Sequence, residues 1–142
     1  PGSAAWHFTT PEGRVGYITD TGIIVEETGE RLLGADLLVL ESNHDVDMLR
    51  AGPYPYQLKK RILGEHGHLS NAAAAEYAVK SVRAGTRSIL LAHLSDENNT
   101  PELALLTVKQ ALEEAGLSPL LAAAPRDGIS APYILEGARC SA

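Results

Sequence analysis

The sequence predicts an α/β fold in which helices cover a sheet of mostly buried strands. Residues 36–41 and 88–93 are short apolar runs without alternation, as in strands that are buried on both faces. Residues 71–83 are rich in alanine, and residues 101–115 carry apolar side chains at helical spacing, so both segments are predicted to be helices. Strands of this kind separated by helices are typical of layered α/β domains.

Size and composition narrow the class of protein. The chain has 142 residues, enough for one domain or part of one. Its 44% hydrophobic and 21% charged residues are ordinary for a globular protein, and a net charge of −6 argues against a basic surface over the whole chain. The single cysteine, Cys140, excludes a disulfide framework and a cysteine metal cluster.

No part of the sequence indicates a membrane or an export signal. No apolar run approaches the roughly 18 residues that span a bilayer. The first residues show no signal-peptide pattern. We therefore expect a cytoplasmic protein without a membrane partner, and the oligomeric state stays open.

The first part of the chain predicts a hairpin, a helix and a strand. Residues 4–10 and 14–19 form two strand-like runs around the turn Pro11-Glu12-Gly13. Residues 23–33 carry an acidic centre between apolar ends and precede Gly34, a plausible helix terminus. The strand at 36–41 follows.

The middle of the chain predicts a short helix and a long one. The short helix is expected at residues 46–50, and the turn-rich stretch 52–56 and the basic segment 57–63 follow it. The helix at 71–83 has Ser70 or Asn71 as its N-cap.

The last part predicts a strand, a helix and two closing strands. After the strand at 88–93, Thr100 and Pro101 provide an N-cap hydroxyl and a proline in the first turn of a helix that Gly116 ends. Residues 120–124 and 131–135 are expected to be strands.

Three predicted strands end in side chains with possible chemical roles. Asp20, Glu41 and His93 each lie at the carboxyl end of a strand, and His68 precedes the alanine-rich helix. Histidines and carboxylates offered from such loops are typical ligands of a divalent metal in a hydrolase. Each of these residues, taken alone, could instead have a structural role, as a turn former or as a hydrogen-bonded core residue. Asp20-Thr21-Gly22 is also the tripeptide of the aspartic proteases.

A basic segment follows the turn-rich stretch. Lys59, Lys60 and Arg61 lie close to Tyr54 and Tyr56, a combination that can contact phosphates and bases. The alternative is a solvated helix face with tyrosines packing the loop.

Several motifs together resemble the metallo-β-lactamase superfamily. Residues 17–22 are similar to its bridging-aspartate motif, residues 91–95 to its last metal-binding histidine, and residues 67–71 to the histidine-plus-helix element of its RNA-processing branch. Residues 40–45 and 52–55 resemble the bacterial DNA exonucleases called YycJ or WalJ. The resemblance covers about residues 14–116.

The resemblance implies the second half of an αββα sandwich and a metal-dependent hydrolase of phosphodiesters in nucleic acid. Asp20 would bridge two divalent ions, zinc or manganese, and His93 would bind one of them. His68 would protonate the leaving oxygen or hold the scissile phosphate, and Glu41 would orient and charge His68. The expected substrate-binding residues are Asn43, His44, Lys59, Lys60 and Arg61.

The family's His-x-His-x-Asp-His motif is absent from this sequence, as is the single histidine that precedes the bridging aspartate. The chain therefore looks like the second half of the fold. We expect residues 1–142 to be one domain or half-domain that is active only with the missing half.

Other protein classes fit the sequence less well or remain open. The helices at 71–83 and 101–115 disfavour an aspartic-protease half, which would be mostly β and would dimerise. A Rossmann-like nucleotide binder would need G-x-G-x-x-G after a strand, which is lacking. A non-catalytic interaction or regulatory module derived from the same fold remains open.

Overall fold

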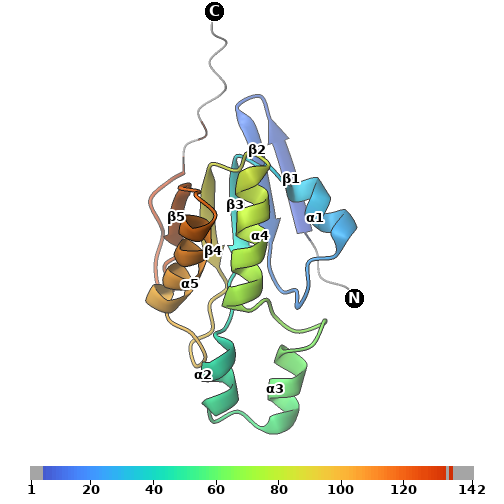
Figure 1. Ribbon diagram of the computed structural model, residues 1–142, viewed down its shortest axis with the longest axis vertical. Helices are drawn as coiled ribbons and strands as arrows, with labels where there is room; N and C mark the ends of the chain where they lie inside the picture. Colours follow the sequence, from blue (N-terminus) through green and yellow to red (C-terminus); the bar gives the residue numbers. More distant parts are fainter. Residues whose placement is uncertain (1–4, 134, 136–142) are drawn as a thin grey trace, which may run out of the picture.

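The computed structural model describes residues 5–133 and 135 of the chain. Cys140 lies outside the described residues. In the described part, a five-stranded sheet has the order β1-β2-β3-β4-β5 (Figure 1). The strands are β1 Ala5–Thr10, β2 Gly13–Ile18, β3 Leu37–Glu41, β4 Ser88–Ala92 and β5 Leu120–Ala123. The first pair is antiparallel and the later neighbours are parallel, which confirms the predicted hairpin and the α/β class.

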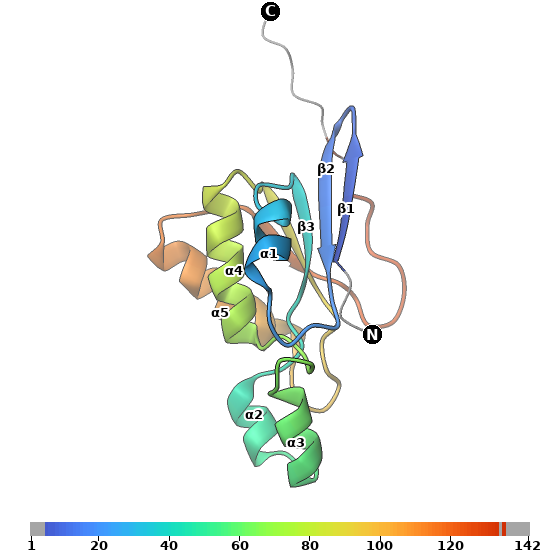
Figure 2. The same ribbon diagram turned by 90° about the vertical axis from the view of Figure 1, so that its right-hand side faces the viewer.

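Three helices cover one face of the sheet, as Figure 2 shows. They are α1 Glu26–Leu32, α4 Asn71–Arg83 and α5 Pro101–Glu114. The short helices α2 Val46–Ala51 and α3 Tyr56–Ile62 lie beyond the carboxyl end of β3 (Figure 1). This places α2 and α3 next to the edge of the sheet where Asp20, Glu41 and His93 follow their strands.

The core lies between the sheet and α4 and α5. Leu40 and Leu91 project from neighbouring strands and are fully buried against apolar residues of the two helices, among them Ala78 and Val108. Burying side chains of this size contributes roughly 1.5–3 kcal/mol each. The core therefore fixes the strand ends from which the candidate site is built.

The predicted helix starts are confirmed by hydrogen bonds. The Ser70 side chain accepts from the Ala73 N–H, and the Thr100 side chain accepts from the Leu103 N–H. Each cap satisfies a backbone donor that the helix itself leaves free.

The second predicted closing strand was wrong. Residues 131–133 and 135 form no strand, while residue 134 lies outside the described part. Pro132 has no N–H to donate to a sheet ladder, which disfavours pairing in the middle of this segment. Helix α1 also begins at Glu26, later than the predicted residue 23.

The opposite face of the sheet carries an apolar row. Trp6, Tyr17, Val39 and Leu90 are consecutive cross-strand partners from β1 to β4. Trp6 is 58% exposed and Tyr17 39% exposed, and the helices of residues 5–133 all lie on the other face or beyond the strand ends (Figure 2). An exposed apolar row of this extent indicates a packing or interaction surface.

Within the described ranges, none of the helices has both the length and the apolar character that a bilayer crossing requires.

Candidate metal centre and substrate cleft

The carboxyl ends of three adjacent parallel strands form the candidate site. Asp20 follows β2, Glu41 ends β3 and His93 follows β4. Because these strands are neighbours in the sheet, residues far apart in the sequence meet at one edge. In open α/β sheets this edge is where ligands usually bind.

Three side chains there could hold a metal ion. Asp20, His68 and His93 each offer one ligand atom, and these atoms lie within 4.8 Å of one another. His93 Nε2 is 3.6 Å from Asp20 Oδ1. The structure therefore brings together Asp20 and His93, as expected from the sequence, and adds His68 to the same group.

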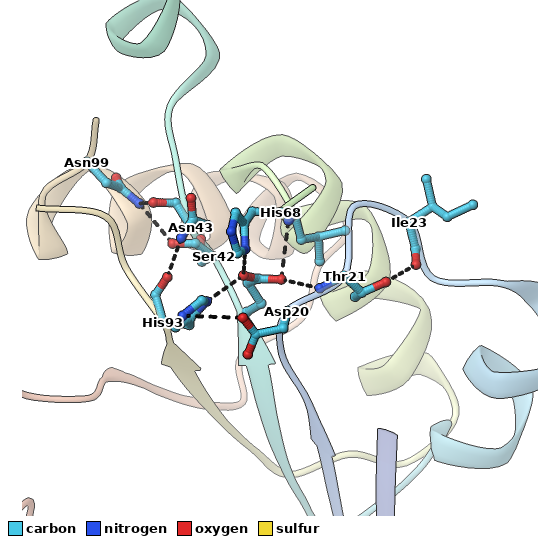
Figure 3. A network of polar contacts seen from close by, with 10 residues as sticks. Asp20, Thr21, Ile23, Ser42, Asn43, His68, His93 and Asn99 are labelled. Atoms are coloured by element: carbon cyan, nitrogen blue, oxygen red, sulfur yellow. Dashed lines mark hydrogen bonds and ion pairs between the residues drawn. The ribbon is translucent and has the colours of Figure 1, made fainter. Parts of the chain in front are cut away.

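Glu41 lies directly behind both histidines. Its Oε1 accepts from His68 Nδ1 at 2.8 Å and from His93 Nδ1 at 2.7 Å, contacts drawn in Figure 3. Its Oε2 accepts from the backbone N–H of Thr21 at 2.9 Å and of Leu69 at 3.3 Å. The Glu41 side chain is fully buried, so these four donors replace its hydration.

This arrangement determines how the histidines can act. A carboxylate only accepts, so each Nδ1 carries the hydrogen and each Nε2 is left for a metal or a substrate. A carboxylate behind a histidine is the usual way in which a metal-binding imidazole is oriented. The Asp/His/His donor set fits a divalent ion such as zinc, for which three protein ligands are typical of a catalytic site. A second ion would need further ligands.

Two of the three candidate ligands have an unusual backbone conformation. Asp20 and His93 have φ angles of 58° and 57°, in the left-handed region that residues other than glycine seldom adopt. The Asn43 amide donates to the His93 carbonyl at 2.8 Å and helps to hold that turn. Such conformations persist where the surroundings fix them, and they cluster at functional sites.

Behind the site, a buried polar network joins the strand and helix ends. The Asn99 amide donates to the carbonyls of Ser42 and Asn43, at 2.8 and 3.1 Å (Figure 3). It also donates to Asn71 Oδ1 at 2.9 Å. The sequence motifs did not single out Asn99. The signal that they missed is an asparagine immediately before the N-cap Thr100.

An open cleft of about 700 Å³ lies in front of the candidate ligands. Its walls include Asp20, Asn43, Tyr54, Leu58, Arg61, Ile62, His66, Gly67, His68, His93, Leu94, Ser95 and Asp96. Of the residues expected to bind substrate, Asn43 and Arg61 line the cleft.

His44 does not line the cleft, contrary to expectation. It is 1% exposed, and neither ring nitrogen has a hydrogen-bond partner in the described part of the chain. Burial lowers the pKa of His44, and His68 acts in the same direction, while Glu41 and Asp45 oppose the shift. The backbone of His44 forms a parallel β-bridge with Ser70, the N-cap of α4, which holds His44 against the start of that helix.

The two lysines of the basic segment also lie elsewhere. Lys59 and Lys60 line a second groove of about 610 Å³, which they share with Arg50 and Tyr56. Lys59 Nζ donates to the carbonyls of Arg50 and Gly52 at 2.6 and 2.7 Å, so it ties α3 to the end of α2. Only Arg61 of the three cations is a lining residue of the cleft.

Gly22 allows the loop after Asp20 to approach the loop before His68. A Cβ at position 22 would lie 2.0 Å from the Gly64 carbonyl oxygen and 2.7 Å from that of Glu65. We expect Gly22→Ala to destabilise the fold by about 1–3 kcal/mol because one backbone must move, measured by urea unfolding. Gly64→Ala is the control, because its nearest contacts are at 3.4 Å; equal stability losses in both variants would contradict the prediction.

The chain matches a known protein family and several known proteins. Residues 2–94 match the model of the Beta-lactamase superfamily domain. The chain is 46% identical over 103 residues to exodeoxyribonuclease YycJ of Bacillus anthracis, covering 72% of this chain and 39% of the relative. It is 43% identical over 100 residues to exodeoxyribonuclease WalJ of Streptococcus pneumoniae serotype 2 strain D39, covering 70% and 37%.

A solved structure shows the same fold. A diphosphatase of the PhnP family superposes with a TM-score of 0.51 at 17% identity, covering 94% of this chain and 44% of that protein. The chain thus spans about two fifths of the length of the curated relatives that it matches. Because the family model matches more than half of its residues, the chain belongs to the metallo-β-lactamase superfamily.

Proposed function

We propose that this chain carries part of the active site of a metal-dependent phosphodiesterase that acts on nucleic acid as an exonuclease. The observation that carries the proposal is the buried Glu41 carboxylate, which orients two histidines beside Asp20. The names of the YycJ and WalJ relatives support a nucleic-acid substrate.

The residues are proposed to divide the work as follows. Asp20 and His93 bind the metal through the carboxylate and Nε2. A bound divalent ion acts as a Lewis acid and lowers the pKa of water. His68, whose Nδ1 contacts Glu41, donates a proton from Nε2 to the leaving oxygen or holds the scissile phosphate. Asn43 and Arg61 contact the substrate from the cleft walls.

We also propose that residues 1–142 are one half-domain of a longer parent protein. The support is the apolar sheet row of Trp6, Tyr17, Val39 and Leu90, together with a metal group of only three residues among those described. The rest of the parent would cover this row and supply the remaining ligands of two ions. The alternative, a non-catalytic interaction module, rests on the same incomplete ligand set.

The test is metal analysis and a nuclease assay on the full-length parent protein. We expect about two zinc or manganese ions per molecule, and exonuclease activity that a chelator removes and the metal restores. A purified parent that hydrolyses no nucleic acid with either metal would favour the non-catalytic module.

Leu90→Ala tests the half-domain proposal. Leu90 lies on the apolar row and is partly exposed in this chain. If the rest of the parent covers it, the substitution costs the parent about 2–5 kcal/mol, the usual loss for a buried leucine. The isolated chain should lose clearly less. Urea unfolding of both proteins decides, and an equal loss in both would contradict the proposed covering.

A further inference from the structure

We propose that Tyr54 and Arg61 form the subsite for the terminal nucleotide of the substrate, with Arg61 on a phosphate and Tyr54 stacked on the base. The inference rests on the proposed nuclease function and deepens it, because it assigns a substrate class to one wall of the cleft.

The first observation is the composition of the cleft. The candidate ligands Asp20, His68 and His93 line one side of it. The α2–α3 hairpin contributes four further lining residues, Tyr54, Leu58, Arg61 and Ile62. This hairpin projects beyond the sheet at the end where the ligands lie (Figure 1). A substrate whose scissile phosphate reached the metal ligands would therefore extend along the hairpin.

The second observation is that α3 has two different faces. Leu58, Arg61 and Ile62 are spaced i, i+3 and i+4, so they share one face, and all three line the cleft. Tyr56 and Lys60 also lie four residues apart and line the second groove. The helix therefore presents one of its cations to the cleft, and Tyr54, just before α3, provides an aromatic ring on the same side.

The third observation is that the Arg61 charge is available. Arg61 is exposed, and across residues 5–133 and 135 no carboxylate lies within salt-bridge distance of it. Asp96, the other acidic lining residue beside Asp20, is already paired with Arg126 at 2.5 Å. An unpaired guanidinium on the wall of a cleft favours a phosphate, to which it can donate two parallel hydrogen bonds.

The size of the cleft suits a single nucleotide, which the proposed exonuclease function makes the terminal one. A volume of about 700 Å³ is within the range of small-ligand pockets. Stacking on a tyrosine accepts any base, so it provides affinity without sequence preference. The ligand class is therefore a terminal nucleotide with its phosphate, and base identity is not read.

The experiment compares two oligonucleotides on the metal-loaded full-length parent, one with a normal terminal nucleotide and one with an abasic terminal nucleotide. Tyr54→Ala is expected to lower kcat/KM about tenfold on the normal end, mainly through KM, and to leave the abasic end unchanged. Tyr54→Phe should restore the normal value, since stacking needs only the ring. Arg61→Ala should lower kcat/KM about tenfold on both ends.

Matched controls come from the second groove. Tyr56→Ala and Arg50→Ala remove the same side-chain types from residues that line the other groove, and both are expected to keep wild-type kcat/KM. The subsite is overturned if Tyr54→Ala affects both ends equally, or if the controls lose as much as the cleft variants.

Fluorescence anisotropy with the same oligonucleotides separates this inference from the proposed function. Preferential binding of the normal end that depends on Tyr54, without hydrolysis, would retain the subsite and overturn the nuclease proposal. Hydrolysis with no preference for the normal end in binding or rate would retain the nuclease and overturn the subsite.

Discussion

The Asp20→Ala variant of the full-length parent is expected to lose bound metal and at least about a thousandfold in nucleic-acid hydrolysis. Asp20 Oδ1 lies 3.6 Å from His93 Nε2, so one carboxylate and one imidazole face the same position. Removing the carboxylate leaves only neutral imidazole ligands. These bind a divalent cation more weakly because they lack the negative charge that offsets it. His93→Ala should have a similar effect because it removes the facing nitrogen.

The measurements are metal content by elemental analysis after gel filtration, and initial rates with added zinc or manganese. His7→Ala is the matched control, because His7 is an exposed histidine on β1, away from the cleft lining. It should keep wild-type metal and rate. A fully metal-loaded and active Asp20→Ala protein would show that Asp20 is not a ligand.

His68 adds a distinction within the same experiment. If His68 acts as the proton donor, His68→Ala retains the metal and loses rate. If it is a third ligand, which its place in the Asp20 and His93 group allows, metal content falls with the rate. Because the geometry is compatible with both roles of His68, metal content is the measurement that distinguishes them.

The positions of Asp20, Glu41 and His93 at strand ends could be predicted, whereas the structure shows that the three strands are neighbours. Unalternating apolar runs indicate parallel strands, and the ends of parallel strands meet. The hydrogen bonds between these side chains depend on local backbone conformation, which no sequence pattern here predicts. Asp20 and His93 also lie in left-handed turns, which a sequence does not reveal at residues other than glycine.

The basic segment shows the same limit. Sequence spacing places Lys59, Lys60 and Arg61 together, but consecutive residues of a helix point about 100° apart, so they cannot all face one cleft. Lys59 is instead held by two backbone carbonyls at the end of α2. His44 was misplaced for a related reason, because a loop residue after a strand can turn inward as easily as outward.

The second large effect is expected at Glu41, where Glu41→Gln and Glu41→Ala separate orientation from stability. In the wild type, four N–H donors converge on the two carboxylate oxygens, two from imidazoles and two from the backbone. A glutamine keeps one acceptor oxygen and replaces the other by an NH₂ donor. In either orientation of the amide, its NH₂ group faces N–H donors of the protein. The substitution also removes the negative charge that holds the two Nδ1–H groups toward position 41.

We expect Glu41→Gln to fold, and to lose about 10–100-fold in metal affinity, the usual effect of removing a carboxylate behind a metal-binding histidine. Activity at saturating metal should also fall, because His68 loses the carboxylate that orients its ring. Metal titration and rates at saturating metal measure the two effects. Unchanged values of both would show that Glu41 does not position the histidines.

Glu41→Ala should act on the fold itself. The truncation leaves two buried backbone N–H groups and two partly exposed imidazole N–H groups without their acceptor. Removing a fully buried charged partner destabilises a protein by about 3–5 kcal/mol. Urea unfolding without metal measures this loss, with Glu27→Ala as the control. Glu27 also accepts from a cation, Arg31, but that pair is on the surface and screened by water. Glu41→Ala should therefore lose much more unfolding free energy than Glu27→Ala. Similar losses in the two variants would contradict the role of the buried Glu41 carboxylate in holding both histidines.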